Sequence, residues 1–212
     1  ITLNREDVKE QRSTGALVRF VLSELPRRII REIERAIILG DGRAAGSDYK
    51  IQEGNPRGFY PVMADAIAEN VFADIYTPTV ADDNYSSVVR AMDLLEAEGR
   101  PVLIAKKGFV TDMRLATNSN GGYIFPLGAD FASILGVAAI VEPDWFNDTT
   151  SPDIDAVLVV LENYRVVGDQ SVEAFTNFLL KTNKQEYLQE IWAGGGLTFR
   201  KSAVAIGEAT SS

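Results

Sequence analysis

Cysteine and histidine are both absent from the 212-residue sequence. Without histidine, Ser-His-Asp and Cys-His catalysis are excluded, and without either residue a zinc site lacks its usual nitrogen and sulfur ligands. The lack of cysteine also excludes a disulfide framework, so the sequence does not indicate the redox state of its compartment. The apolar runs are shorter than the roughly 18 residues that span a membrane, and no signal peptide is visible. We therefore expect no membrane partner.

Acidic residues outnumber basic ones by 30 to 21, which gives a net charge of −9. An acidic chain is a poor candidate for a free-standing nucleic-acid binder, because such proteins present a basic face. The content of 46% apolar and 24% charged residues is typical of an ordinary globular protein. The length allows one large domain or two small ones.

Helical and strand patterns are mixed without regular βαβ alternation, which predicts the α+β class. Ser23 and Pro26 indicate the start of a helix over 26–39, and Gly40 indicates its end. The patterns predict further helices at 62–73, 84–98 and 107–115. Residues 17–22 are predicted as a strand or as the approach to the first helix. Other strands are predicted at 102–105, 123–125, 137–141, 156–161, 164–167, 186–199 and 203–206, with a tight hairpin at Glu162-Asn163.

Some features suggest a catalytic or binding site, but each has a simpler structural explanation. The glycines of Gly40–Gly46 would have to follow a strand and open a helix to hold a phosphate, whereas they close a helix. Asp82-Asp83 and the pair Asp153 and Asp155 could coordinate Mg²⁺ or Ca²⁺, yet they also suit a helix N-cap and a turn. Gly194–Gly196 mark a bend in a strand or a close approach to a ligand. We expect no catalytic, cofactor-binding or metal-binding residues and no small-molecule substrate.

Arg27, Arg31 and Arg35 lie four residues apart and form one like-charged row on the helix at 26–39. This row is either a solvated face or a surface that meets an acidic neighbour. Because the chain as a whole is acidic, it carries both signs of such a contact, which favours self-association.

Several short motifs follow one another along residues 17–206. In order, they are Glu34–Gly42, Arg100–Ile104, Met113–Leu115, Gly122–Pro126, Ile134–Val141, Asn183–Tyr187, Glu190–Trp192 and Leu197–Ile206. Each motif is weak alone, but their order and spacing together resemble the major capsid proteins of tailed phages, which have the Hong Kong 97-type capsid fold.

The resemblance implies two domains. Residues 1–78 and 168–195 would form a peripheral domain with a long "spine" helix at 26–39, and residues 79–167 and 196–212 would form an axial domain. Arg27, Arg31 and Arg35 would face neighbouring subunits or the shell interior. A loop at 118–122 or 142–153 would lie near the symmetry axis of a capsomer.

By the same resemblance, the protein is a structural protein and not an enzyme: the major capsid subunit of a phage or prophage. Its partners would be copies of itself, in hexamers and pentamers that close an icosahedral shell around DNA without sequence-specific binding. It would be made in the cytoplasm of the bacterial host and end in the virion.

The family's N-terminal arm and extended loop are largely missing before the expected spine helix, which implies an N-terminally truncated subunit. Some members cross-link a lysine of that loop to an asparagine of a neighbour. Asn183 lies near the matching region and, like Arg27, Arg31 and Arg35, is a candidate residue of the subunit interface, but the resemblance there does not extend to a cross-link. Two alternatives stay open: an encapsulin-type nanocompartment shell on the same fold, and a small acidic enzyme that uses carboxylates with a divalent ion.

Overall fold

Five α-helices and two sheets make up the computed structural model, which describes residues 2–4, 16–40, 58–67, 71–117, 120–126, 128, 130–148 and 153–208. The helices within these ranges are α2 (Ala16–Ile38), α3 (Val62–Ile67), α4 (Asn84–Met92), α5 (Lys107–Arg114) and α6 (Phe131–Leu135). Short 3₁₀ helices lie at Asp144–Asp148 and Leu161–Asn163. No helix of the described segments is both long and apolar enough to cross a membrane.

One sheet has five strands in the order β2-β8-β5-β3-β4. They are β2 (Ala73–Tyr76), β3 (Val102–Ala105), β4 (Ile140–Val141), β5 (Asp153–Val159) and β8 (Ala203–Glu208). Strand β2 is parallel to β8, and β3 is parallel to β4, whereas β5 runs antiparallel to both β3 and β8. The central strands are apolar at nearly every position, which is typical of a sheet covered on both faces.

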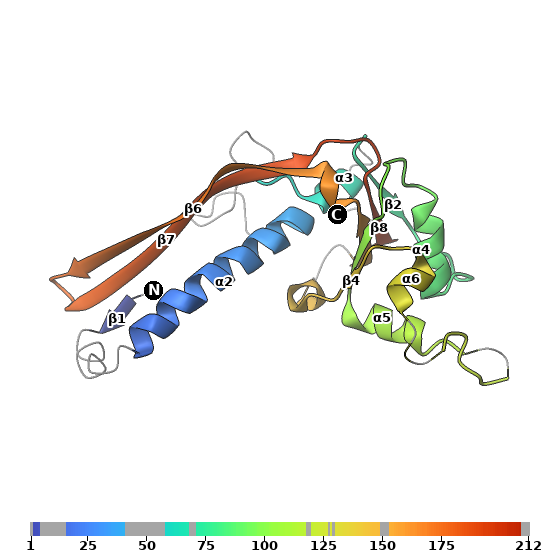
Figure 1. The fold of residues 1–212 in the computed structure, drawn as a ribbon, viewed down its shortest axis with the longest axis horizontal. Coiled ribbons are helices and arrows are strands. Elements are labelled where there is room, and N and C mark those ends of the chain that lie inside the picture. Colours follow the sequence, from blue (N-terminus) through green and yellow to red (C-terminus); the bar gives the residue numbers. More distant parts are fainter. Residues whose placement is uncertain are drawn as a thin grey trace.

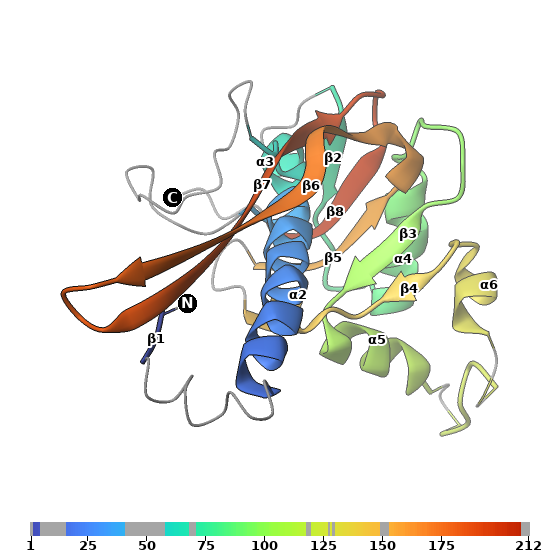
Figure 2. The same cartoon turned by 60° about the vertical axis from the view of Figure 1, so that its left-hand side comes forward.

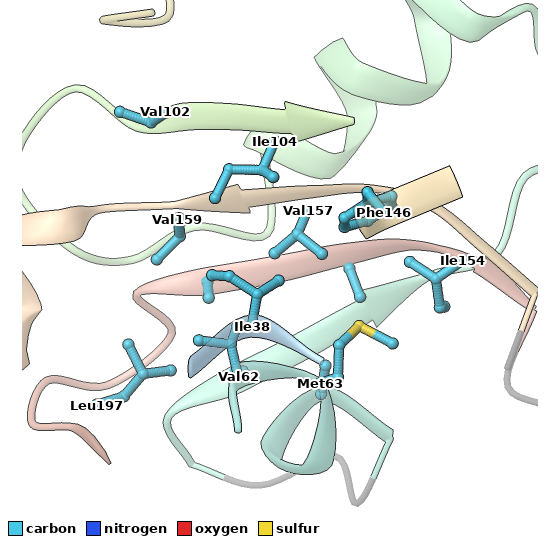
Figure 3. Close-up of a cluster of buried hydrophobic side chains, with 14 of the residues drawn as sticks. Ile38, Val62, Met63, Val102, Ile104, Phe146, Ile154, Val157, Val159 and Leu197 are labelled. Carbon is cyan, nitrogen blue, oxygen red and sulfur yellow. The ribbon is translucent and has the colours of Figure 1, made fainter. Parts of the chain in front are cut away.

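Helices cover both faces of this sheet (Figure 2), and a hydrophobic core lies on each face. Neighbouring residues of β5 point to opposite faces, so Val157 enters one core and Leu158 the other. The first core is covered by α3 and the end of α2, and its side chains include Ile38, Val62, Met63, Phe146 and Val159 (Figure 3). The second core is covered by α4, α5 and α6, and its side chains include Val88, Val110, Met113, Phe131 and Leu135.

A second sheet projects from this body (Figure 1). Its strands are β1 (Thr2–Asn4), β6 (Tyr164–Leu179) and β7 (Lys184–Leu197), in the antiparallel order β1-β7-β6. Helix α2 contacts β7, and the hairpin diverges from the helix toward its tip (Figure 2). We call α2 together with this hairpin the extension.

The first helix is longer than the sequence predicts, because it begins at Ala16 and contains Pro26 in its interior. Ser23 does not cap it: its hydroxyl donates to the carbonyl of Phe20 at 2.8 Å, as a serine inside a helix does. Residues 17–22 therefore belong to the helix and not to a strand. The predicted end is confirmed, since Gly40 has φ 85° and its amide donates to Ala36 at 3.2 Å.

The helix predicted at 84–98 ends early, at Met92. The amides of Leu94 and Leu95 bond to carbonyls only three residues back, and the amide of Glu96 bonds to Lys201 instead. This hydrogen bond to a residue distant in the sequence directs the segment away from the helix axis. By contrast, β3 and α5 have nearly the predicted bounds.

The hairpin predicted at Glu162-Asn163 is wrong. Strands β5 and β6 belong to different sheets, and the 3₁₀ turn at Leu161–Asn163 carries the chain from one to the other. Helix α6 is not predicted from the sequence. Of the strand predicted at 137–141 only Ile140–Val141 pair, and in place of the strand predicted at 123–125 Tyr123 makes a single bridge to Thr117.

Candidate functional site

The carboxylate of Asp82 is occupied by groups of the protein itself. Its Oδ2 accepts hydrogen bonds from the hydroxyl of Tyr76 (2.8 Å) and from the amide (2.9 Å) and hydroxyl (2.8 Å) of Thr79. Its Oδ1 lies 3.1 Å from Nε of Arg90, and the side chain is 1% exposed. These bonds, led by those from Thr79, lower the pKa of Asp82 to about 2. Asp82 therefore joins β2 to α4 and has no lone pair aimed at a ligand.

Asp83 is the N-cap of α4, as predicted. Its Oδ1 accepts the amide of Ser86 at 2.7 Å, and Ser86 Oγ accepts the amide of Asp83 at 3.0 Å, which completes a capping box. The hydrogen bonds from Ser86 lower the pKa of Asp83. Asp83 thus has a structural role like that of Asp82.

The second acidic pair lies on β5 and not in a turn. Asp155 Oδ1 lies 2.9 Å from Nζ of Lys106, and the Asp153 side chain lies outside the described part of the structure. Within the described residues, no group of three carboxylates could hold a metal ion. Of the glycine-rich segment, Gly40 closes α2, and residues 41–46 lie outside the described ranges.

The three glycines of β7 allow another part of the backbone to approach closely. Gly195 pairs with Phe59 in a parallel bridge: its amide donates to Gly58 at 3.1 Å, and its carbonyl accepts the amide of Tyr60 at 2.7 Å. A Cβ on Gly194 would lie 2.7 Å from the carbonyl oxygen of Gly58. The close approach is therefore made by the chain's own residues 58–60, where the extension meets the body. A hollow of about 740 Å³ lies beside this junction.

The structure divides the predicted arginine row. Arg27 and Arg31 are exposed, whereas Arg35 is half-buried and its Nε has no hydrogen-bond partner among the described residues. Nη1 of Arg27 lies 3.2 Å from Oε1 of Glu24 on the same helix. Three large apolar side chains of α2 are also exposed, namely Phe20, Leu22 and Ile30.

Exposure alternates along β7, whereas residues 173–178 of β6 are exposed on both sides of the strand. Along β7, Tyr187 is buried and Gln189 and Ile191 are half-buried, whereas Leu188, Glu190 and Trp192 are exposed. This alternation along β7 follows the two-residue period of a strand, and α2 also contacts β7. Phe175 of β6 lies directly opposite Leu188, and Glu173 lies directly opposite Glu190. We call Glu173, Phe175, Leu188, Glu190 and Trp192 the outer hairpin face.

Sequence reasoning missed the outer hairpin face. Trp192 is 63% exposed, Leu188 51% and Phe175 50%, so this face presents large apolar side chains to solvent. The alternation over 186–199 was a usable signal for the strand. The alternation could not reveal which side of the strand is more exposed to solvent, because that exposure depends on packing between distant segments.

Asn183 lies in the turn between β6 and β7, at the tip of the extension (Figure 1). It has φ 51°, a left-handed conformation that asparagine adopts more readily than most residues. The turn itself therefore gives a physical reason for an asparagine at this position. Among the described residues, no hydrogen bond links Asn183 to Arg27, Arg31 or Arg35.

Comparison with known proteins gives a consistent result. No family model matches the chain. The major capsid protein of Lactococcus phage c2 is 21% identical over 205 residues, which is 93% of this chain and 37% of that protein. A chain from Gordonia phage Cozz superposes with a TM-score of 0.67 at 14% identity, covering 98% of this chain and 67% of the other. The capsid of an empty GTA particle gives 0.63 at 12% identity, covering 97% and 70%.

The chain has the Hong Kong 97-type capsid fold. The resemblance and the α+β class predicted from the sequence are thereby confirmed. The capsid fold covers the extension as well as the body, because the superposed region includes almost the whole chain. The chain spans little more than a third of the length of its curated relative.

Proposed function

We propose that the protein is the major capsid subunit of a tailed phage or prophage. The observation that carries this proposal is similarity over almost the whole chain, in sequence to a phage major capsid protein and in fold to phage and GTA capsids. On this proposal the protein is structural and not an enzyme. Its partners are copies of itself, in hexamers and pentamers, and its final location is the virion after synthesis in the bacterial cytoplasm.

The shape of the molecule supports self-assembly. A projecting extension that exposes aromatic and aliphatic side chains is costly for a protein that stays monomeric, since contiguous apolar surface normally marks an interaction site. The acidic net charge supports a shell that encloses DNA without gripping it, because like charge disfavours non-specific binding to phosphates.

We further propose the division into domains that the resemblance implies. Residues 1–78 and 168–195 form the peripheral domain, and residues 79–167 and 196–212 form the axial domain. The two separate sheets support this division for β3, β5, β7 and β8, whereas β2, within residues 1–78, pairs with β8 in the sheet of the body. The loop at 118–122 or the loop at 142–153 then lies near the capsomer axis. Arg27, Arg31, Arg35 and Asn183 belong to the intersubunit surface, or, for the arginines, to the inward surface.

The experiment is to express the complete gene product and examine it by sedimentation velocity and negative-stain microscopy. Capsomer rings or closed shells are expected. A folded product that stays monomeric at high concentration would contradict the proposal. No observation favours the encapsulin shell or the metal-dependent enzyme over a phage capsid subunit.

A further inference from the structure

Strand β6 forms one edge of its three-stranded sheet, because β7 lies between it and β1. Among the described residues, no strand pairs with the outer edge of β6, and residues 173–178 are exposed on both faces. Native proteins blunt such edges with proline, lysine or a bulge, since open backbone groups recruit another strand. Residues 173–179 contain neither proline nor lysine, and the irregularity of β6 lies before them, between Asp169 and Glu173. This edge is therefore built to accept a further strand.

The same part of β6 carries side chains that the subunit leaves unsatisfied. Phe175 is 50% exposed, and Leu180, in the turn that follows β6, is 85% exposed. Glu173 lies directly opposite Glu190 of β7, and like charges in this position destabilise an antiparallel pair. Neither glutamate forms an ion pair with a cation among the described residues. A strand that suits this edge brings an apolar group opposite Phe175 and a cation opposite Glu173.

The segment is complementary to itself in this way. If two copies of β6 are set antiparallel about Asn177, Phe175 of each copy lies opposite Leu179 of the other. Glu173 of each copy then lies opposite Lys181 of the other, at the first turn beyond β6. The two Asn177 side chains face each other, and an amide can both donate and accept a hydrogen bond.

Neighbouring registers lack this complementarity. Moving the axis one residue toward the start of β6 places Glu173 opposite Leu179 and Phe175 opposite Asn177. Moving it one residue toward the end places Phe175 opposite Lys181 and Asn177 opposite Leu179. Both shifts set polar or charged groups against apolar ones, so the pattern of side chains selects the axis at Asn177.

The backbone hydrogen bonds fit the same register. Gly195 of β7 directs its amide and carbonyl away from β6, toward the segment 58–60. Because this orientation alternates along a strand, Glu186 directs its own groups toward β6, where it pairs with Asn177. Asn177 therefore bonds back to β7, and Thr176 directs its amide and carbonyl to the outer edge. With the axis at Asn177, the outward-directed groups of the two copies face each other.

We propose that β6 of one copy pairs with β6 of a second copy, antiparallel and about a two-fold axis at Asn177. This inference rests on the proposed function and names one surface through which the subunits associate. The two-fold axis of an antiparallel strand pair is perpendicular to the sheet, so both hairpins turn the same face to the same side. The contact therefore extends the sheet sideways, and the two copies lie next to each other in one layer.

The position of Asn177 decides which copies are joined. It lies two residues before the end of β6, near the tip of the extension, and α4, α5 and α6 lie at the opposite end of the molecule (Figure 1). The two bodies therefore lie at opposite ends of the pair. The contact is isologous and closes after two copies, so it cannot by itself build a ring. It joins a subunit of one capsomer to a subunit of the next.

A cysteine at the axis tests the pairing, because the chain has no cysteine of its own and every disulfide must join two copies. The variant is Asn177→Cys in the complete gene product, treated with oxidised glutathione and run on a non-reducing gel. Directly opposite residues of such a pair have Cα atoms about 4.5 Å apart, within the usual disulfide range of roughly 4.4–6.8 Å. A dimer that disappears on reduction is expected.

Ala174→Cys is the matched control, since Ala174 is exposed on the same strand. In the proposed register it lies opposite residue 180, so its two copies are six residues, or about 20 Å, apart along the strand. It should give about tenfold less dimer than Asn177→Cys, because this distance exceeds the disulfide range. Circular dichroism melting checks that both variants fold.

Charge at the axis gives an independent test. Asn177→Lys alone and Asn177→Asp alone each set two like charges against each other across the two-fold axis. Each is expected to raise the protein concentration at which shells close about tenfold or more, while rings still form. A one-to-one mixture should restore closure, because lysine then faces aspartate. If Asn177→Asp does not fold, since Asn177 lies opposite Glu186, the cysteine test decides alone.

The outcomes separate this pairing from the proposed function. If the unmodified product assembles but Asn177→Cys gives no more dimer than Ala174→Cys, the pairing is wrong and the capsid function stands. The pairing is also wrong if both folded charge variants close shells at the unmodified concentration. If the unmodified product does not assemble and Asn177→Cys still cross-links selectively, the capsid function fails and the pairing stands. If there is neither assembly nor selective cross-linking, both fail.

Discussion

Asp82 and Arg90 are joined by an ion pair, with Oδ1 and Nε 3.1 Å apart, that ties the turn after β2 to the last turn of α4. The same carboxylate accepts three further hydrogen bonds from Tyr76 and Thr79. All of these partners favour the charged form, and they hold the pKa near 2, below the ordinary 3.8. The Asp82 carboxylate therefore links a strand to a helix, and the strength of this link depends on pH.

Removing this charge should change how stability depends on pH. Because the folded-state pKa is lowered, Asp82 stabilises the fold above its unfolded pKa, and this contribution is lost as the pH falls from about 4 to about 2. Asp82→Asn should therefore lower the free energy of unfolding at pH 7 and flatten its fall over that range. Urea unfolding at several pH values measures this. The charge-matched control is Asp112→Asn, which removes one exposed carboxylate from α5.

The glycines at the junction of extension and body should differ sharply in their tolerance of alanine. A Cβ on Gly195 would lie 2.5 Å from the carbonyl oxygen of Arg165, whereas one on Gly196 would meet its nearest atom, Cβ of Tyr60, at 3.6 Å. Gly195→Ala should destabilise by about 1–3 kcal/mol through overpacking. Gly196→Ala should cost much less. Equal losses for the two variants, measured by chemical denaturation, would contradict this account of the junction.

The capping box of α4 offers a third test. Asp83→Ala removes the acceptor for the amide of Ser86 and should cost about 1 kcal/mol. Asp83→Asn keeps an oxygen in the same place, so it should stay close to the original stability. A loss of equal size in both variants would mean that the charge, and not the hydrogen bond, supplies the stabilisation.

Magnesium should not stabilise the protein through the acidic pair at 82–83. Every oxygen of Asp82 is already bonded, and Asp83 is committed to the helix end. Adding Mg²⁺ should therefore leave the melting temperature unchanged, since a ligand stabilises only the state it binds. A rise that disappears in Asp82→Asn would instead support the metal-dependent enzyme.

Both cores should be sensitive to truncation. Phe146 and Leu158 are fully buried on opposite faces of the five-stranded sheet. Phe146→Ala should cost about 3–5 kcal/mol and Leu158→Ala about 2–5 kcal/mol. Val80→Ala, at a fully exposed position, should stay within about 0.5 kcal/mol. A small loss at Phe146 would show that its core is loosely packed.

The sequence predicted well those elements whose signals are local. Val102–Ala105 reads as a strand because it is apolar throughout and follows a proline, and Asp83 reads as an N-cap because the apolar spacing of a helix begins after it. The capsid fold itself came from the order of motifs, each of which was weak.

The elements and surfaces that the sequence does not predict correctly have a common physical cause, which is packing between distant segments. Pro26 looked like a helix start, yet α2 continues through it and contacts β7. Strand β6 was predicted only to residue 167, because the extension exposes residues on both sides of the strand and so lacks a simple alternation. The outer hairpin face could not be found for the same reason.

The position of β8 determines when the body can complete its fold during synthesis. This strand lies between β2 and β5 in the sheet, yet it follows both of them in the chain. While the ribosome is still adding the residues of the hairpin, β2 and β5 have no strand between them, and neither core is closed. The body therefore completes its fold only after the extension has been synthesised, which delays contacts that need a finished subunit until translation has passed residue 208.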